Sequence, residues 1–185
     1  MSESTKEAIR IARANGHICM INTGRTKRLV GENLTGQVEF DGLLLGCGTE
    51  IEYHGKQLMH KTFSMEESKA ILAAMKKYHV DAVLEGSRED YAPRGEEVFT
   101  ETFRHMAREI ENRKYDRYAN APGNYDKLYA YAETPAGMDG MKRDLSEILD
   151  FIDREQGIFQ GNSNPLHYGL FEDPHGRHCG HRRQQ

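Results

Sequence analysis

Residues 17–26 read H-I-C-M-I-N-T-G-R-T, and this stretch decides how the first part of the chain is expected to fold. His17–Asn22 is a nearly continuous apolar run of strand length, which favours a parallel β-strand covered on both faces. The next residues, Thr23, Gly24 and Arg25, end the strand and are expected to open a helix. They are candidate phosphate-binding residues, because a hydroxyl, a flexible glycine and helix N-terminal amides can surround an anion. By itself, such a T-G-R is more often an ordinary turn.

The segments on either side of this stretch also carry local structure signals. A capping box that begins at Ser4 and a stop signal at Asn15-Gly16 predict a helix before the strand. Leu43–Leu45 predicts a short strand, and Thr49–Phe63 predicts a hairpin. The first part of the chain is therefore expected to alternate helices and strands.

Helices and strands also alternate along the rest of the chain. Helices are predicted at Ser64–Tyr78, Phe99–Ile110 and Met138–Ile148, and strands at Val80–Leu84, Tyr125–Glu133 and Phe151–Ile152. Gly86–Gly95 and Arg113–Gly123 are predicted to be polar loops. Strands that alternate with amphipathic helices indicate an α/β fold.

The composition excludes several classes of protein. Of the 185 residues, 37% are hydrophobic and 29% are charged, and the net charge of -4 argues against general nucleic-acid binding. No apolar run is long enough to span a bilayer, and no signal segment opens the chain. Three widely spaced cysteines favour a reducing compartment over a disulfide framework. We therefore expect a cytoplasmic protein that binds neither nucleic acid nor membranes, and we predict no partner protein.

Three longer stretches resemble Cof-type phosphatases of the haloacid-dehalogenase superfamily. Ser4–Arg25 resembles their second conserved motif, in which a helix with A-I, a glycine and an apolar strand precede T-G-R. The resemblance continues through F-D-G-L-L-L-G-C-G-T-E-I at Phe40–Ile51 and D-F-I-D-R-E at Asp150–Glu155. It implies a partial Rossmann-like core in residues 1–50 and a large inserted α/β cap in residues 51–156.

The resemblance implies a magnesium-dependent phosphatase that acts on small phosphorylated metabolites such as sugar phosphates. Thr23 matches the Ser or Thr that holds a phosphate oxygen in this family. The family's nucleophile lies in D-x-D-G-T, and a lysine in S-K-G and acidic residues in G-D-x-x-N-D complete the site. This chain contains none of these motifs, and it has Gly46–Thr49 where many relatives have N-G-A. We assign no catalytic residue and no metal ligand, and we expect no turnover. The alternative is a non-catalytic remnant of the fold that binds a ligand or a partner.

Residues 157–185 have no usable periodicity and are expected to form an irregular tail. If their codons are read one nucleotide later, they permit S-K-G with its lysine at Gln160 and G-D-S-N with its aspartate at Arg183. Our hypothesis is that this tail is out of frame and that the true start lies upstream of Met1. The tail also contains H-x-x-H-C-x-H at His175–His181, a weaker candidate set of zinc or copper ligands.

A few residues remain with open interpretations. Asp81, Glu85 and Asp90 could line the substrate side of the cap, but solvated loop positions are the commoner outcome for such residues. Cys19 is expected to be a small core residue and Cys47 can be exposed; neither has a nearby base that suggests a nucleophile. No motif discriminates among sugar phosphates, nucleotides and cofactor phosphates as substrates.

Overall fold

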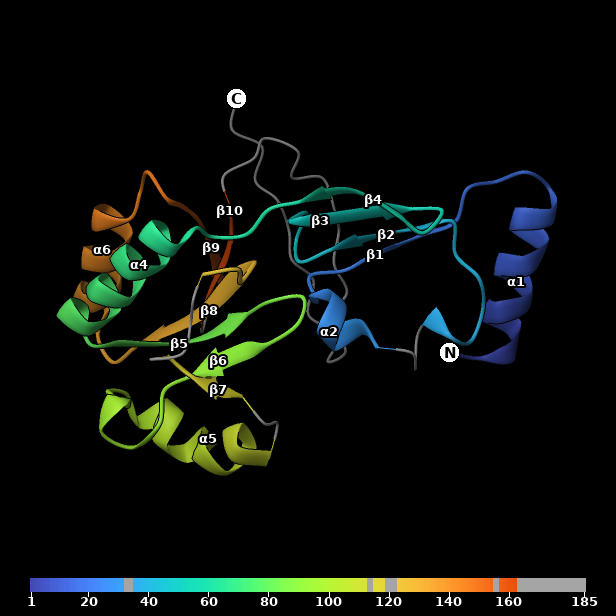
Figure 1. The fold of residues 1–185 in the computed structure, drawn as a ribbon. Helices are drawn as coiled ribbons and strands as arrows, with labels where there is room; N and C mark the ends of the chain where they lie inside the picture. Colours follow the sequence, from blue (N-terminus) through green and yellow to red (C-terminus); the bar gives the residue numbers. More distant parts are fainter. Residues whose placement is uncertain (32–34, 113–114, 119–122, 155–156, 163–185) are drawn as a thin grey trace. The chain divides into compact units, whose positions relative to one another are not determined.

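The chain divides into two units, which are described separately (Figure 1). The computed structural model describes residues 1–31, 35–112, 115–118, 123–154 and 157–162. The first unit contains Met1–His60, and the second begins at Lys61. Both strands of the predicted hairpin belong to the first unit, because the first of them pairs with the strand that precedes it in the chain.

The first unit is built on a four-stranded sheet in the order β1-β2-β3-β4. Its elements are α1 (Glu3–Ala14), β1 (Met20–Asn22), α2 (Lys27–Val30), β2 (Gly42–Leu45), β3 (Glu50–Tyr53) and β4 (Lys56–His60). β1 and β2 are parallel, whereas β2, β3 and β4 form antiparallel neighbours. The turn between β3 and β4 has positive φ at both His54 and Gly55, which matches the predicted two-residue hairpin.

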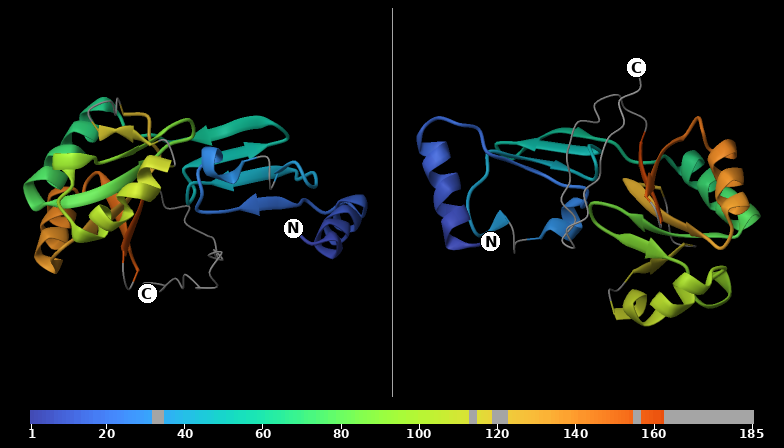
Figure 2. Two further views of the ribbon diagram at one scale, coloured as in Figure 1. Left: turned by 90° about the horizontal axis from the view of Figure 1, so that it is seen from below. Right: turned by 180° about the vertical axis from the view of Figure 1, so that it is seen from behind.

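The first strand is shorter and more open than predicted. The apolar run from His17 yields a strand of only Met20–Asn22, and this strand lies at the edge of its sheet. Ile21 is buried, but Ile18 is 64% exposed and Met20 is 36% exposed. The prediction that the strand is covered on both faces is therefore wrong for the described residues. Figure 2 shows the reason: α1 lies beyond the end of the sheet where β1 begins, and none of its residues is buried.

α1 is joined to the sheet by the carboxylate of Asp41. Arg13 Nε and Nη2 donate to Asp41 Oδ1 at 3.2 and 3.0 Å, and the backbone N–H of Cys19 donates to Oδ2 at 2.7 Å. The Cys19 N–H and the Arg13 guanidinium together hold the pKa of Asp41 below its ordinary value. The helix itself is capped at Ser2, whose hydroxyl accepts from a backbone N–H, rather than at the predicted Ser4.

The second unit is a six-stranded mixed sheet with helices on both faces, in the order β7-β6-β5-β8-β10-β9. Its elements are α4 (Met65–Tyr78), β5 (Val80–Glu85), β6 (Asp90–Ala92), η1 (Gly95–Glu97), α5 (Glu101–Asn112), β7 (Asp116–Arg117), β8 (Lys127–Ala132), α6 (Pro135–Asp144), β9 (Leu149–Arg154) and β10 (Gly157–Asn162). β6 and β7 are parallel, and the other neighbouring strands are antiparallel.

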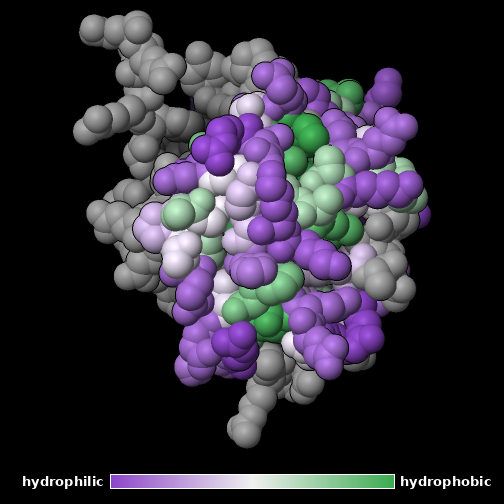
Figure 3. All heavy atoms as spheres, turned by 90° about the vertical axis from the view of Figure 1, so that its left-hand side faces the viewer, coloured by the Kyte–Doolittle hydropathy of each residue, from purple (hydrophilic) through white to green (hydrophobic). Residues whose placement is uncertain are grey.

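Alternate residues of β5 define the two faces of this sheet. Ala82 and Leu84 pack in the larger core with buried residues of α4 and α6. Val83 points to the other face and packs with Phe103 of α5. The outer surface of α4 and α6 is mainly hydrophilic (Figure 3), as expected for amphipathic helices that cover a sheet.

The strongest local signals of the second unit agree with the structure, and the weaker ones do not. The predicted helix start at Ser64 is confirmed by a capping box, in which Glu67 N donates to Ser64 Oγ at 3.2 Å and Ser64 N donates to Glu67 Oε2 at 2.8 Å. The predicted loops contain the short strands β6 and β7, and the predicted irregular tail begins with β10. β6 and β7 are only three and two residues long, which is too short to show an alternating pattern, and β10 contains two glycines, which are unfavourable in strands.

Asp81 of β5 has a structural role that the sequence analysis did not anticipate. Its carboxylate accepts from Thr100 N at 2.7 Å, from Thr100 Oγ1 at 2.8 Å and from Phe99 N at 3.1 Å. Thr100 Oγ1 in turn accepts from Phe103 N at 3.3 Å in the first turn of α5. Burial raises the pKa of Asp81 above its ordinary value, against the opposing effect of these hydrogen bonds. Asp81 therefore anchors the start of α5 and is neither solvated nor open to a substrate.

We expect the Asp41→Asn substitution to lower the melting temperature, and the difference from the parent to depend on pH. The folded-state pKa of Asp41 is depressed, so its stabilisation is present above the unfolded-state pKa and is lost as pH falls through the folded-state value. The difference should be constant from neutral pH to about pH 5 and shrink below about pH 4. Thermal melts at several pH values measure it; a difference that stays constant to pH 2 would contradict this assignment.

We expect the Asp81→Ala substitution to destabilise the chain by about 2 kcal/mol, because it leaves buried donors of Phe99 and Thr100 without an acceptor. Urea unfolding followed by circular dichroism measures the change. Asp139→Ala is the matched control, since Asp139 is exposed on α6. Equal unfolding midpoints for the two variants would show that Asp81 does not anchor α5.

Candidate functional site

The candidate phosphate-binding residues lie where the two parallel strands of the first unit end. Thr23 directly follows β1, and Gly46 directly follows β2. Because β1 and β2 are parallel, their carboxyl ends lie at the same edge of the sheet. The N–H of Thr23 donates to Leu44 O at 2.9 Å and so continues the ladder into the loop. In α/β sheets, ligands bind at the carboxyl ends of parallel strands.

The two loops at this edge are hydrogen-bonded to one another. Gly46 N donates to Arg25 O at 2.9 Å, and Cys47 N donates to Thr23 O at 3.5 Å. The turn after β2 therefore holds both ends of the Thr23–Arg25 segment. The sequence analysis noted Gly46–Thr49 only as a departure from N-G-A. It had no means of placing this turn against Thr23–Arg25, because local patterns do not reveal which strands are neighbours.

The side chains of this segment present two groups that suit an anion. Arg25 N donates to Thr23 Oγ1 at 3.2 Å, so the hydroxyl accepts from the backbone and its own proton can be donated to a ligand. The Arg25 side chain is exposed, and no hydrogen bond or ion pair of its guanidinium is found among the described residues. A hydroxyl donor and a guanidinium two residues apart can bind a phosphate or carboxylate group.

The expected contribution of a following helix is not supported. α2 begins at Lys27, two residues beyond Arg25, and is a single short turn. Thr26 occupies the N-cap position, but its side chain makes no capping hydrogen bond. Thr26 is fully buried, and its hydroxyl has no hydrogen-bond partner among the described residues. The candidate anion-binding groups of this loop are therefore the Thr23 and Arg25 side chains rather than helix amides.

The described carboxylates of the first unit, taken alone, do not form a magnesium site. Magnesium requires several oxygen ligands in near-octahedral geometry. Asp41 is paired with Arg13, and Glu52 is 2.5 Å from Lys27 Nζ. Glu50 is buried and accepts from a glutamine side chain at 3.0 Å. The described residues of either unit, taken alone, contain no group of three close histidine, cysteine or carboxylate ligands. They do not fit a magnesium ion, and we derive no step through one.

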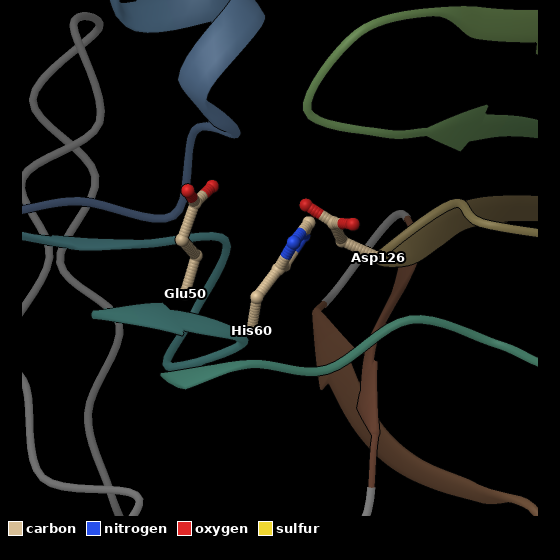
Figure 4. Close-up of side chains that lie close together, drawn as sticks. All are labelled: Glu50, His60 and Asp126. Atoms are coloured by element: carbon tan, nitrogen blue, oxygen red, sulfur yellow. The ribbon is translucent and has the colours of Figure 1, made fainter. Parts of the chain in front are cut away.

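Figure 4 shows the side chains of Glu50 on β3 and His60 on β4, which occupy paired positions in the hairpin. Asp126, labelled in the same view, belongs to the second unit, which is described separately. Two side chains are too few for a metal site, and a histidine nitrogen is not a preferred ligand of magnesium.

Several interpretations of individual residues need correction. Cys47 is buried rather than exposed, and Cys19 is half-buried and precedes β1 instead of lying in a core strand. Among the acidic residues of the second unit, Asp90 is buried and accepts from the N–H of Gly86 at 3.2 Å.

Glu85 of β5 is also not a solvated loop residue. It forms an ion pair with the buried Lys127 at the facing position of β8. The candidate metal ligands at His175–His181 and the frameshift position Arg183 lie outside the described residues, whereas Gln160 belongs to β10.

Comparison with known proteins assigns the family. The model of haloacid dehalogenase-like hydrolases matches residues 1–161. This chain belongs to that family. The family's phosphatases act on small phosphorylated substrates and generally use Mg²⁺. No curated protein matches the sequence significantly.

Solved structures of this superfamily have the same fold. A phosphatase from Bacteroides thetaiotaomicron is similar with a TM-score of 0.70 at 16% identity, over 90% of this chain and 61% of that protein. A subclass IIB sugar phosphatase has a TM-score of 0.66 at 15% identity, over 89% and 64%. A hypothetical protein from Geobacillus kaustophilus has a TM-score of 0.66 at 17% identity, over 89% and 63%.

This chain therefore spans somewhat less than two thirds of each of these neighbours. At such low identities the likeness shows the fold alone. In the parts of the chain that the structure describes, no helix is both long and apolar enough to cross a membrane.

We expect the Thr26→Val substitution to stabilise the chain by about 1 kcal/mol. Valine keeps the shape of threonine and removes a buried hydroxyl that has no partner among the described residues. Urea unfolding measures the change, with Thr102→Val on the exposed face of α5 as the control. A loss of stability at Thr26 would show that its hydroxyl has a partner, such as ordered water.

Proposed function

We propose that this chain is the phosphate-binding and cap-bearing part of a phosphatase for small phosphorylated metabolites, with sugar phosphates as the favoured class. One observation carries the proposal: the Thr23 hydroxyl and the Arg25 guanidinium lie together on a loop held at the carboxyl ends of parallel strands. The family's substrates are phosphorylated, so the ligand of this loop is taken to be the phosphoryl group.

Each residue of the loop has a chemical task in this proposal. The Thr23 O–H donates to one phosphate oxygen, while the Arg25 guanidinium supplies parallel N–H donors and a positive charge to the others. Gly24 has no side chain between them, so a phosphate can approach the backbone. None of these groups is a nucleophile toward phosphorus, and the chain has no D-x-D motif that would supply one.

Binding without turnover is therefore the activity proposed for the chain as written. The family implies Mg²⁺ as the cofactor that neutralises the phosphate charge, but the described residues of neither unit, taken alone, supply a ligand set for it. The alternative is that the fold serves only to bind a ligand or a partner, as the missing motifs would also allow. A phosphatase assay distinguishes an inactive chain from an active enzyme. A phosphate-binding measurement tests the loop directly.

The binding test is a titration of ¹⁵N-labelled chain with inorganic phosphate, followed by two-dimensional NMR. We expect the amides of Thr23–Arg25 to shift, and expect Thr23→Val or Arg25→Met to weaken binding by about tenfold, because each removes a hydrogen bond to a charged oxygen. Arg10→Met is the matched control, since Arg10 pairs with Glu7 on the surface of α1. Equal losses in all three variants, or no shifts in the loop, would contradict the assignment.

The turnover test uses p-nitrophenyl phosphate with Mg²⁺. We expect no hydrolysis above that of the Thr23→Val variant, because no carboxylate nucleophile is available in a family motif. Magnesium-dependent hydrolysis that disappears in Thr23→Val would show that the chain is an active enzyme. The proposal of binding without turnover would then be abandoned.

A further inference from the structure

The turn after β2 carries a side chain where the backbone favours glycine. Gly46, Cys47 and Gly48 have φ values of 60°, 62° and 92°, so three successive residues lie in the left-handed region. Glycine adopts this region without penalty, whereas a residue with a Cβ costs about 1 kcal/mol or more there. The chain thus accepts backbone strain at Cys47 in order to carry a thiol at this position.

The thiol of Cys47 packs directly against the phosphate-binding loop. A Cβ built on Gly24 would lie only 2.9 Å from Cys47 Sγ, which is closer than real Cβ contacts allow. Gly24 does not have a positive φ, so its backbone would accept another residue. Glycine is therefore required at position 24 because a larger side chain would collide with the Cys47 sulfur, and not because of the backbone conformation.

Three backbone hydrogen bonds surround this contact. Thr23 N bonds to Leu44 O, Thr23 O accepts from Cys47 N, and Arg25 O accepts from Gly46 N. These bonds hold Thr23 and Arg25 on either side of Gly24, and the Cys47 sulfur packs against Gly24 itself. Cys47 is only 9% exposed, so the thiol lies inside this arrangement rather than on the surface.

We propose that Cys47 is a positioning residue for the phosphate-binding loop. Its sulfur fixes the place of Gly24 and thereby sets the separation and direction of the Thr23 hydroxyl and the Arg25 guanidinium. This inference rests on the proposed function of the loop. It goes beyond that function because it proposes that the size of one side chain on the neighbouring turn controls how well the loop binds phosphate. Small displacements of binding groups have large effects on affinity, so the contact has a measurable consequence.

The test is a double-mutant cycle between Gly24→Ala and Cys47→Ala, with the affinity of the full chain for inorganic phosphate as the readout. Alanine at position 47 removes only the sulfur and keeps the same backbone strain. We expect Gly24→Ala to weaken phosphate binding by about tenfold or more, because its methyl group must displace either the sulfur or the loop. Cys47→Ala alone should weaken binding by about threefold, since it leaves the loop less confined.

The double variant distinguishes positioning from simple damage. Removing the sulfur makes room for the new methyl group, so Gly24→Ala with Cys47→Ala should bind within about twofold of Cys47→Ala alone. Cys19→Ala is the matched control: it removes another thiol of the same unit, beyond the opposite end of β1, and should leave the affinity unchanged. Thermal unfolding of each variant ensures that titrations are made on folded protein.

The outcomes separate this inference from the function on which it rests. If the parent chain does not bind phosphate, the proposed function fails and the positioning role fails with it. If the parent binds but the losses of the two single variants simply add in the double variant, the positioning role alone is overturned. Binding by the double variant at the level of Cys47→Ala supports both.

Discussion

Parallel pairing of β1 with β2 brings together two loops that are more than twenty residues apart in the chain, and the candidate site depends on it. Met20, Ile21 and Asn22 pair with Gly42, Leu43 and Leu44, and the ladder continues through Thr23 N into the loop. The turn after β2 can then bond to Thr23 and Arg25. A parallel pair with a different register would leave the same residues on an ordinary surface turn.

Because β1 is short, its pairing with β2 depends on contacts made by the neighbouring residues. The strand has three residues, lies at a sheet edge and buries only Ile21. Its entry is held by Asp41, which accepts from Cys19 N and from Arg13 of α1. Charged hydrogen bonds thus help to hold β1 in place, whereas a buried parallel strand is held by apolar packing on both faces.

Several of the described carboxylates form structural contacts. Asp41 fastens α1, Asp81 anchors the start of α5, and Glu85 is paired with Lys127. A carboxylate whose oxygens accept several protein hydrogen bonds, or whose charge is already neutralised, is a poor ligand for a hard cation. Acidic composition alone therefore says little about magnesium binding by this chain.

Sequence reasoning succeeded where a local motif contains its own physical explanation. The Ser64 capping box and the His54-Gly55 turn follow from hydrogen bonds and backbone angles within a few residues. It failed for the strands β6, β7 and β10 and for the covering of β1. β6 and β7 are too short to show an alternating pattern, β10 contains two glycines, and the covering of β1 depends on tertiary packing.

The sequence by itself determined the family resemblance, the α/β character and the residue types of the candidate phosphate-binding loop. Thr23, Gly24 and Arg25 could be singled out because a hydroxyl, a glycine and a cation after a strand have a recognisable chemistry. Only the tertiary structure decided that Cys47 limits the space beside Gly24 and that Asp81 anchors a helix. Both contacts join segments that are distant in the chain, and such contacts are set by strand pairing and packing rather than by local propensity.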